Sequence, residues 1–190
     1  MSQEVATIAP AFDQIVAAYQ ENPLLAKQQF RVFLNKKPNP AWIVDGYGKK
    51  YKTFRIGDLQ QLLDMVFFCG WSTKNFQHTV IGNEICGTIE LHLIDPFSGE
   101  HREIVGTAAV AIQVDAGADG LDMRNKKAKA LEMGFPKLST MCFKNAARQI
   151  GTLFGRDINR DVVLETVDVV SKQDEILDDI IEDAQIEMEL

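Results

Sequence analysis

Basic residues recur at helical spacing in the segment 137–155, which reads KLSTMCFKNAARQIGTLFG. Lys137, Lys144 and Arg148 are seven and four positions apart, so a helix would place all three on one face. Each positively charged side chain in such a row can meet a phosphate group of a nucleic acid. The spacing predicts a phosphate-binding helix, and the alternative is an ordinary solvated helix surface.

The apolar residues of the same segment predict how this helix is held in the fold. Pro136 stands just before the segment, Ser139 or Thr140 can cap its first turn, and Gly155 can end it. We expect a helix over 137–155 with its basic row on the outer side. Its core-facing stripe follows the i, i+3, i+4, i+7 pattern and contains Phe143, Ala146, Ala147, Ile150, Leu153 and Phe154.

Two further basic clusters are candidates for the same chemistry. The first contains Lys49, Lys50, Lys52 and Arg55, interleaved with Tyr47 and Tyr51, and mixed basic and aromatic residues suit single-stranded nucleic acid. The alternative is a set of loop lysines that only aid solubility. The second cluster lies in the Gly- and charge-rich segment 115–135, which we expect to be a loop or a weak helix. Its basic members are Arg124, Lys126, Lys127 and Lys129.

Catalytic signatures are absent from the sequence: it has no Gly-rich phosphate loop, no Cys-x-x-Cys, no His-Glu-x-x-His and no Gly-x-Ser-x-Gly. His78, His92 and His101, with Glu90 or Asp95, could in principle ligate a metal, but their positions favour scattered polar residues on a solvated sheet face. A metal-dependent nuclease would need clustered carboxylates with a lysine nearby. Glu84, Glu90 and Glu103 have no lysine at short spacing, so we predict no catalytic residue, metal or cofactor and a protein that is not an enzyme.

Composition and charge narrow the class of protein. The 190 residues are 46% hydrophobic and 25% charged, typical of a globular protein, and no apolar run approaches the roughly 20 residues of a membrane span. The first residues, MSQEVATIAPAFDQ, resemble no export signal, so we expect a cytoplasmic protein, in a bacterial or phage-infected cell, with no membrane partner. Cys69, Cys86 and Cys142 are expected to be buried as small apolar residues.

The net charge of −7 is distributed unevenly along the chain. Residues 157–190 contain twelve acidic and two basic residues, a net charge of −10, whereas residues 1–156 have a net charge of +3. The acidity is therefore a property of the C-terminal segment, and the rest of the chain is mildly basic. A low overall isoelectric point does not argue against a nucleic-acid partner here.

The elements that must position these clusters can be predicted from periodicity. Helices are expected over 10–21, 23–34 and 57–68, a short hairpin over 41–52, and strands over 72–81, 84–94 and 101–113. This predicts an α+β fold in which an antiparallel meander of three to four strands packs on the long helix. Residues 1–40 would form a helical N-terminal region, 41–160 the core domain and 161–190 an acidic tail. That tail would hold an added strand over 162–170 and an acidic helix over 171–190.

Four motifs, in this order, resemble the Rad-fifty-two/Sak-type single-strand annealing proteins of eukaryotic recombination and of phages. They are a helix end FFCGW (67–71), a strand pair around CGTIELHLIDPFSGEHREIVG (86–106), a basic loop, and a helix FKNAARQIGTLFG (143–155). The family's helix has the form Leu-Lys-Arg-Ala-hydrophobic-Arg-x-hydrophobic-Gly. The resemblance covers about residues 54–156 and assigns the family's two basic helix positions to Lys144 and Arg148. Asn145 stands where the family usually has Arg.

The resemblance implies a β-β-β-α core that assembles side by side into a homo-oligomeric ring or helical filament. Single-stranded DNA would lie in an outer groove with its phosphates on Lys144 and Arg148 and its bases exposed for pairing. A basic residue that the family has ahead of the FFCGW helix would be one of Lys49, Lys50 or Lys52. The implied function is annealing of complementary strands in recombination and repair, with no covalent step.

Two alternatives and a role for the tail are part of the same prediction. The first alternative is an oligomeric scaffold whose basic face meets an acidic partner, and the weakest alternative is the metal-dependent nuclease considered above. The acidic tail would either pack on its own domain, moderate DNA binding, or recruit a replication or recombination partner.

Overall fold

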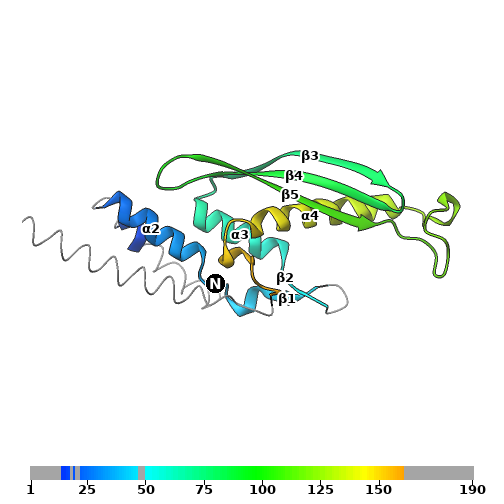
Figure 1. Ribbon diagram of the computed structural model, residues 1–190, viewed down its shortest axis with the longest axis horizontal. Coiled ribbons are helices and arrows are strands. Elements are labelled where there is room, and N and C mark those ends of the chain that lie inside the picture. The colour runs from blue at the N-terminus through cyan, green and yellow to red at the C-terminus, as the bar shows by residue number, and fades with distance from the viewer. Residues whose placement is uncertain (1–13, 18, 20–21, 47–49, 161–190) are drawn as a thin grey trace, which may run out of the picture. The chain divides into compact units, whose positions relative to one another are not determined.

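The computed structural model describes residues 14–17, 19, 22–46 and 50–160 (Figure 1). Residues up to Ile158 form one compact unit, and Asn159–Leu190 form a second. Every helix and strand given below belongs to the first unit. The strand predicted over 162–170 and the acidic helix predicted over 171–190 lie outside the described residues.

The N-terminal region is helical, as predicted. Residues 14–17 and 19 are helical. Helix α2 (Pro23–Leu34) follows, begun by Asn22, whose side chain accepts a hydrogen bond from the backbone N–H of Leu25. After a one-turn 3-10 helix, η1 (Pro40–Trp42), strands β1 (Ile43–Asp45) and β2 (Lys52–Phe54) form the predicted hairpin, and helix α3 is Ile56–Phe67.

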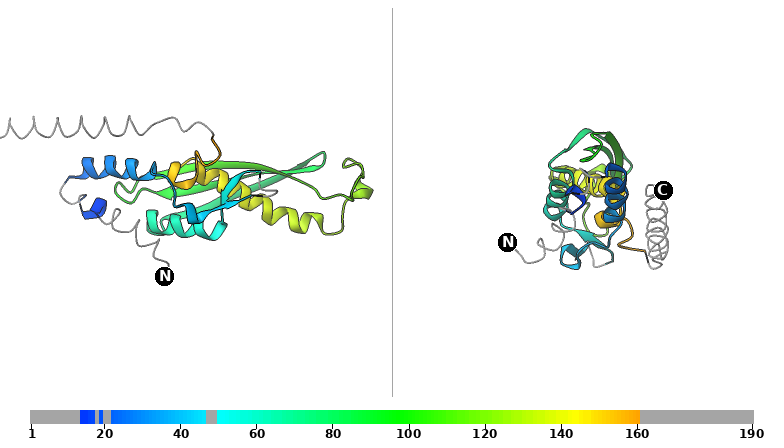
Figure 2. Two further views of the ribbon diagram at one scale, coloured as in Figure 1. Left: turned by 90° about the horizontal axis from the view of Figure 1, so that it is seen from below. Right: turned by 90° about the vertical axis from the view of Figure 1, so that its left-hand side faces the viewer.

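A three-stranded antiparallel sheet forms the centre of the fold. Its order is β3 (Trp71–Ile81), β4 (Glu84–Ile94), β5 (His101–Ala111), and β4 pairs with both neighbours along its length. Helix α4 (Ala130–Arg148) packs across β4 and β5 (Figures 1 and 2). The predicted α+β class, an antiparallel meander packed on a long helix, is confirmed, with three strands in the meander.

The inward-facing residues of the strands meet α4 at very close range. On β4, the alternate residues Ile85, Gly87, Ile89, Leu91 and Leu93 are buried, as the period-two pattern predicts. Gly106 of β5 lies against the helix backbone, where an added Cβ would be 2.1 Å from the carbonyl oxygen of Cys142. Only glycine allows this approach, so it sets the distance between α4 and the sheet.

Helix α4 differs from the predicted 137–155 helix at both ends. It begins at Ala130, so Pro136 lies inside it and neither Ser139 nor Thr140 is its N-cap. The proline ring removes one backbone donor, but Pro136 is on the exposed side, and burial of Ala130 and Leu138 holds the first turns against the sheet. The helix ends at Arg148. A 3-10 turn, η4 (Thr152–Phe154), follows and buries Leu153 and Phe154. Gly155, with φ of 89°, ends this turn and not the helix.

The prediction that all three cysteines are buried is wrong. Cys142 is buried, Cys86 is half-buried and Cys69 is exposed. Cys69 follows the end of α3 with a left-handed backbone (φ 59°), which takes it out of the helical stripe. Cys86 alternates with the buried Ile85 and Gly87, so it lies on the outer side of β4. No helix in the described part combines the length and the hydropathy that a membrane-spanning segment needs.

Candidate nucleic-acid interface

Lys144 and Arg148 lie in a seam between α4 and the β1–β2 hairpin, and not on the open outer face that their spacing predicted. Both side chains are half-buried. The ammonium Nζ of Lys144 donates a hydrogen bond of 2.5 Å to the backbone carbonyl of Phe54 on β2. The guanidinium of Arg148 makes a long contact, 3.4 Å, from Nη1 to Oδ1 of Asn145. The difference arises because the hairpin packs beside the helix and partly covers Lys144 and Arg148.

Phe54 fixes the hairpin to the rest of the fold, and Tyr51 joins the two strands of the hairpin to each other. The Phe54 side chain is buried at 3% exposure, and its ring fills the space above Gly155, where a Cβ would be 2.8 Å away. The ring of Tyr51 lies directly on Gly46, whose N–H donates to the Tyr51 carbonyl at 2.7 Å. Tyr51 is also close enough to Arg148 to interact with it electrostatically. Two glycines therefore let aromatic rings hold β1 and β2 next to the cations.

The electrostatics of the seam favour binding of an anion. Burial lowers the pKa of Lys144, and the neighbouring charge of Arg148 lowers it further. Burial also lowers the pKa of Arg148, and Tyr51 acts in the opposite direction. Within the described part of the chain, no carboxylate forms an ion pair with either residue. Two adjacent cations are thus partly removed from water without an acidic partner, and a phosphate group would supply that partner.

Asn145 and Gln149 have a role that sequence analysis missed. The side-chain amide of Asn145 donates to the Thr107 carbonyl at 2.8 Å, and that of Gln149 donates to the Val105 carbonyl at 2.7 Å. Both carbonyls belong to β5, an edge strand of the sheet. No local signal identifies this role, because the partners are about forty positions apart. Asn145 therefore protects a sheet edge where the resembled family usually has a cation.

The first lysine cluster lies on the same hairpin as the seam. Lys50 is exposed, and Lys52 at the start of β2 forms an ion pair with Asp45 across the hairpin at 2.5 Å. Arg55 is exposed at the N-cap position of α3, directly after Phe54. Lys49, like Tyr47, lies outside the described residues. The structure thus brings Lys50, Lys52 and Arg55 to the element that carries the Lys144 acceptor.

Lys137 is exposed on α4, seven residues before Lys144, which corresponds to about 10 Å along the helix axis. It continues the basic row toward the N-terminal half of α4. It is not part of the half-buried seam that Lys144 and Arg148 share.

The loop cluster is not brought together with the seam. Lys126, Lys127 and Lys129 precede the first residue of α4, whereas Lys144 lies fourteen residues into it, about 21 Å along the axis. Figures 1 and 2 show the loop beyond the end of the sheet, away from the hairpin. Lys129 is 3.7 Å from the carboxylate of Glu132.

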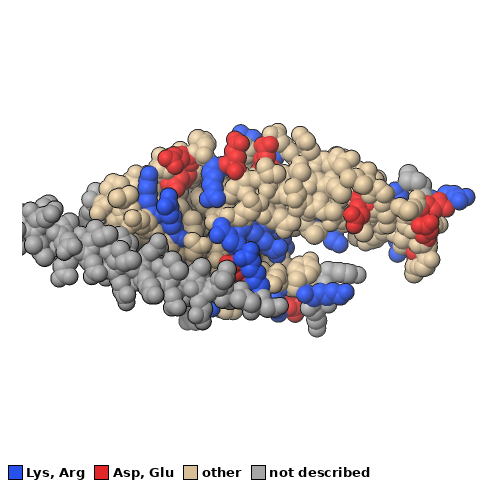
Figure 3. Space-filling view, in the orientation of Figure 1, with Lys and Arg blue, Asp and Glu red and all other residues tan. Residues whose placement is uncertain are grey.

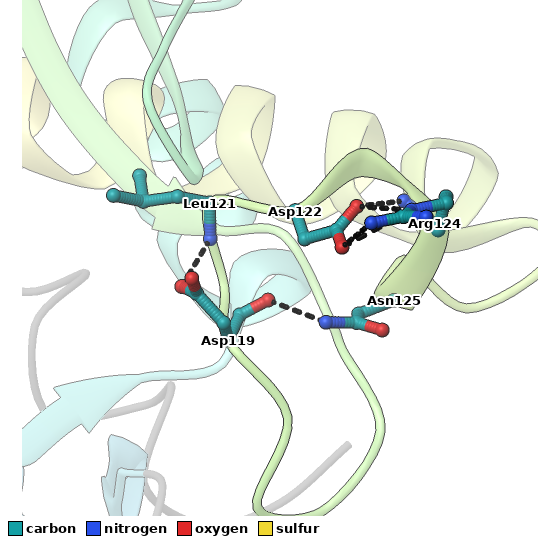
Figure 4. Close-up of polar contacts among 5 residues, drawn as sticks. All are labelled: Asp119, Leu121, Asp122, Arg124 and Asn125. Carbon is teal, nitrogen blue, oxygen red and sulfur yellow. Dashed lines mark hydrogen bonds and ion pairs between the residues drawn. The ribbon is translucent and has the colours of Figure 1, made fainter.

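The loop is also held by its own polar contacts, as Figure 4 shows. Arg124 forms a two-pronged ion pair with Asp122, which lowers the pKa of that carboxyl and raises the pKa of Arg124. The side chain of Asp119 accepts from the Leu121 N–H, and Asn125 donates to the Asp119 carbonyl. Arg124 therefore already has an acidic partner, unlike Arg148.

The histidines are distributed over the sheet. His92 lies on the outer face between Glu90 at 3.1 Å and Glu103 at 3.4 Å, and its hydrogen bond with Glu90, together with one from Asn75, lowers the pKa of Glu90. His78 packs on the ring of Phe135. Among the described residues, no group of three or more His, Cys, Asp or Glu side chains is placed to hold a metal ion.

Lys and Arg side chains gather over the middle of one molecular face, between the sheet and the β1–β2 hairpin, and continue toward the end where α2 and the β4–β5 turn lie (Figure 3). Acidic side chains on this face are fewer in that middle region. Neither a protein-family model nor a curated protein sequence matches the chain. The function is therefore argued from the geometry of the site.

Proposed function

We propose that the chain is a single-stranded DNA-binding protein that anneals complementary strands in recombination or repair. The observation that carries the proposal is the pair of half-buried cations, Lys144 and Arg148, with no acidic partner among the described residues. Burying charge in this way costs stability unless an anion compensates for it. A phosphodiester oxygen meets that need and is present in every nucleotide, so binding would not depend on sequence.

The order of elements supports the same proposal. The resembled annealing proteins have a β-β-β-α core with two basic positions on the helix, and the fold here has that order with Lys144 and Arg148 in the seam. Phosphates held in the seam would leave the bases facing away and open to a complementary strand. Such a mechanism forms and breaks no covalent bond, so it needs no nucleophile, metal or cofactor.

We further propose a homo-oligomer, because a unit of such modest charge would hold a strand weakly by itself. Repeated weak sites along one strand add through effective concentration. Strand β3 supports assembly: ten of its eleven residues are exposed, and its outer backbone edge pairs with no other strand in the described unit. The β5 edge, in contrast, is covered by Asn145 and Gln149. A neighbouring copy on β3 would bury this surface.

The test is the double variant Lys144→Ala with Arg148→Ala. Its control is Lys36→Ala with Lys37→Ala, which removes the same charge from two exposed residues that follow α2. Loss of two phosphate contacts should reduce the slope of log affinity against log salt by about 1.4 for a single strand, and abolish annealing. The control variant should keep both. Lys144→Met with Arg148→Met, which retains the apolar stems, separates loss of charge from loss of packing. Normal annealing by both seam variants would refute the assignment.

An annealing assay with and without EDTA separates the proposal from its two alternatives. Annealing that persists in EDTA supports the proposal. No effect on DNA under either condition favours the oligomeric scaffold with an acidic partner. Magnesium-dependent cutting would favour the nuclease, although no observation among the described residues supports that alternative.

A further inference from the structure

A hollow with a volume of about 340 Å³ lies where α2, the end of α3 and the β4–β5 turn meet. Its floor is apolar and consists of Phe30, Leu34, Phe67 and Leu93, each at most 8% exposed. The floor belongs to three elements that pack as part of the main core, so the hollow is a fixed feature of the fold. It is separate from the seam that holds Lys144 and Arg148.

The rim of this hollow is charged. Lys27 and Arg31 are four residues apart on α2, and Arg102 on β5 lies opposite the floor residue Leu93 in the sheet register. Asp95 and Glu100 stand on the same rim, yet none of the five forms an ion pair among the described residues. Three cations and two carboxylates thus line the hollow, and none of the cations is joined in an ion pair to a carboxylate that the structure describes.

The two carboxylates are positioned in different ways. Oδ1 of Asp95 accepts the backbone N–H groups of Phe97 and Ser98 at 2.9 and 2.8 Å, so Asp95 is fixed by the turn. Glu100 is exposed, and its backbone N–H donates to the Ser98 hydroxyl at 3.4 Å. The rim therefore offers both donors for an anion and acceptors for an amino group, above an apolar floor.

We propose that this hollow binds one nucleotide unit of a single strand, with the phosphate on Lys27, Arg31 and Arg102 and the base on the apolar floor. A volume of 340 Å³ is at the small end of ligand pockets, which suits one such unit. The carboxylates of the rim accept from the exocyclic amino group of cytosine, which thymine lacks, so the site favours cytosine over thymine. The inference rests on the proposed function for its ligand, and it adds a base-selective contact to a backbone-binding protein.

The position of the hollow fits a strand that also occupies the seam. Lys and Arg side chains on the face shown in Figure 3 extend from the region over α2 and the β4–β5 turn to the β1–β2 hairpin. A strand following these cations would pass both sites. The hollow would then hold one of its nucleotides while neighbouring phosphates lie in the seam.

The test uses the full chain and oligodeoxycytidylate and oligothymidylate of equal length, measured by fluorescence anisotropy over a salt series. Lys27→Ala with Arg31→Ala should lower the salt slope by about 1.4 relative to the wild type. The control, Lys36→Ala with Lys37→Ala, should leave the slope unchanged, because neither residue lines the hollow. Wild-type protein should bind the cytidylate several-fold more tightly, and Glu100→Gln should reduce that preference.

The outcomes separate this inference from the proposed function. If Lys27→Ala with Arg31→Ala behaves like its control and no cytosine preference exists, the hollow is not a nucleotide site, even if the seam variants abolish annealing. If the hollow variants lose affinity while the seam variants do not, the inference stands and the seam assignment fails. Deoxycytidine monophosphate tests whether the hollow binds a free nucleotide instead of a strand. If it binds saturably, the hollow variants abolish this binding, and the wild type binds no strand, then the ligand of the hollow is a free nucleotide and the proposal of a strand is overturned.

Discussion

The Nζ of Lys144 on α4 lies 2.5 Å from the carbonyl oxygen of Phe54 on β2, a residue ninety positions earlier in the chain. This bond joins the helix that carries the basic row to the hairpin that covers it. It also directs the ammonium group into a partly dehydrated seam beside Arg148. The binding site that we propose is therefore a property of two elements together, and each contributes one side of it.

Replacing Arg148 with Met should raise the pKa of Lys144, because it removes the like charge that, after burial, lowers this pKa. A ¹³Cε chemical-shift titration of Lys144 measures the change directly.

The lowered pKa of Lys144 also predicts how the stability of the fold depends on pH. Between the folded and unfolded pKa values of Lys144 the unfolded chain binds more protons, so the free energy of unfolding should rise with pH in that alkaline window. The rise should be smaller in the variant, and an unchanged titration would show that the two charges do not interact.

Replacing Gly106 with Ala should destabilise the fold by about 1–3 kcal/mol. The new Cβ would be 2.1 Å from the Cys142 carbonyl oxygen and 2.6 Å from the Ala146 nitrogen, so α4 must move away from β5. Gly57→Ala is the matched control, since the added Cβ in the first turn of α3 would have no atom from another part of the fold within 4 Å. Urea denaturation should show a lower midpoint only for Gly106→Ala. Equal midpoints would mean that the contact between α4 and β5 is not as close as described.

Replacing Asn145 with Leu and Gln149 with Met should open the β5 edge. The carbonyls of Thr107 and Val105 would each lose an amide donor, at a cost of about 1 kcal/mol apiece. An uncovered edge strand can pair with another chain, so sedimentation should show association that grows with concentration. The control, Gln60→Leu with Gln61→Met, makes the same kind of change on the exposed side of α3. Association of both variants to the same extent would indicate a general effect of added apolar surface.

Deleting residues 171–190 should tighten binding to single-stranded DNA. The deletion removes eight acidic residues and one lysine, and so takes away a net charge of −7 that repels a polyanion. The gain should be largest at low salt and vanish as salt screens the repulsion. A full-length variant with these acids changed to Asn and Gln should reproduce the gain if charge alone is responsible. If the affinity is unchanged across the whole salt series, the tail does not influence DNA binding.

Local patterns in the sequence predicted most of the architecture. The period of two in β4 and the stripe of Leu59, Leu62, Leu63 and Val66 in α3 each place one face in the core, so the strands and this helix follow from residue types alone. The start of α4 did not follow, because Pro136 normally stops a helix. Packing of Ala130 and Leu138 against the sheet outweighs that local preference.

Spacing along the chain is enough to place Lys144 and Arg148 on one side of a helix, because four residues make about one turn. What that side contacts depends on the packing of distant elements. The pairing of Lys144 with Phe54, the amides of Asn145 and Gln149 on β5, and the hollow beneath Lys27, Arg31 and Arg102 all join residues far apart in the chain. Periodicity reports which way a side chain points from its own element. The partner it reaches depends on how the elements pack, and that packing places two cations in a seam.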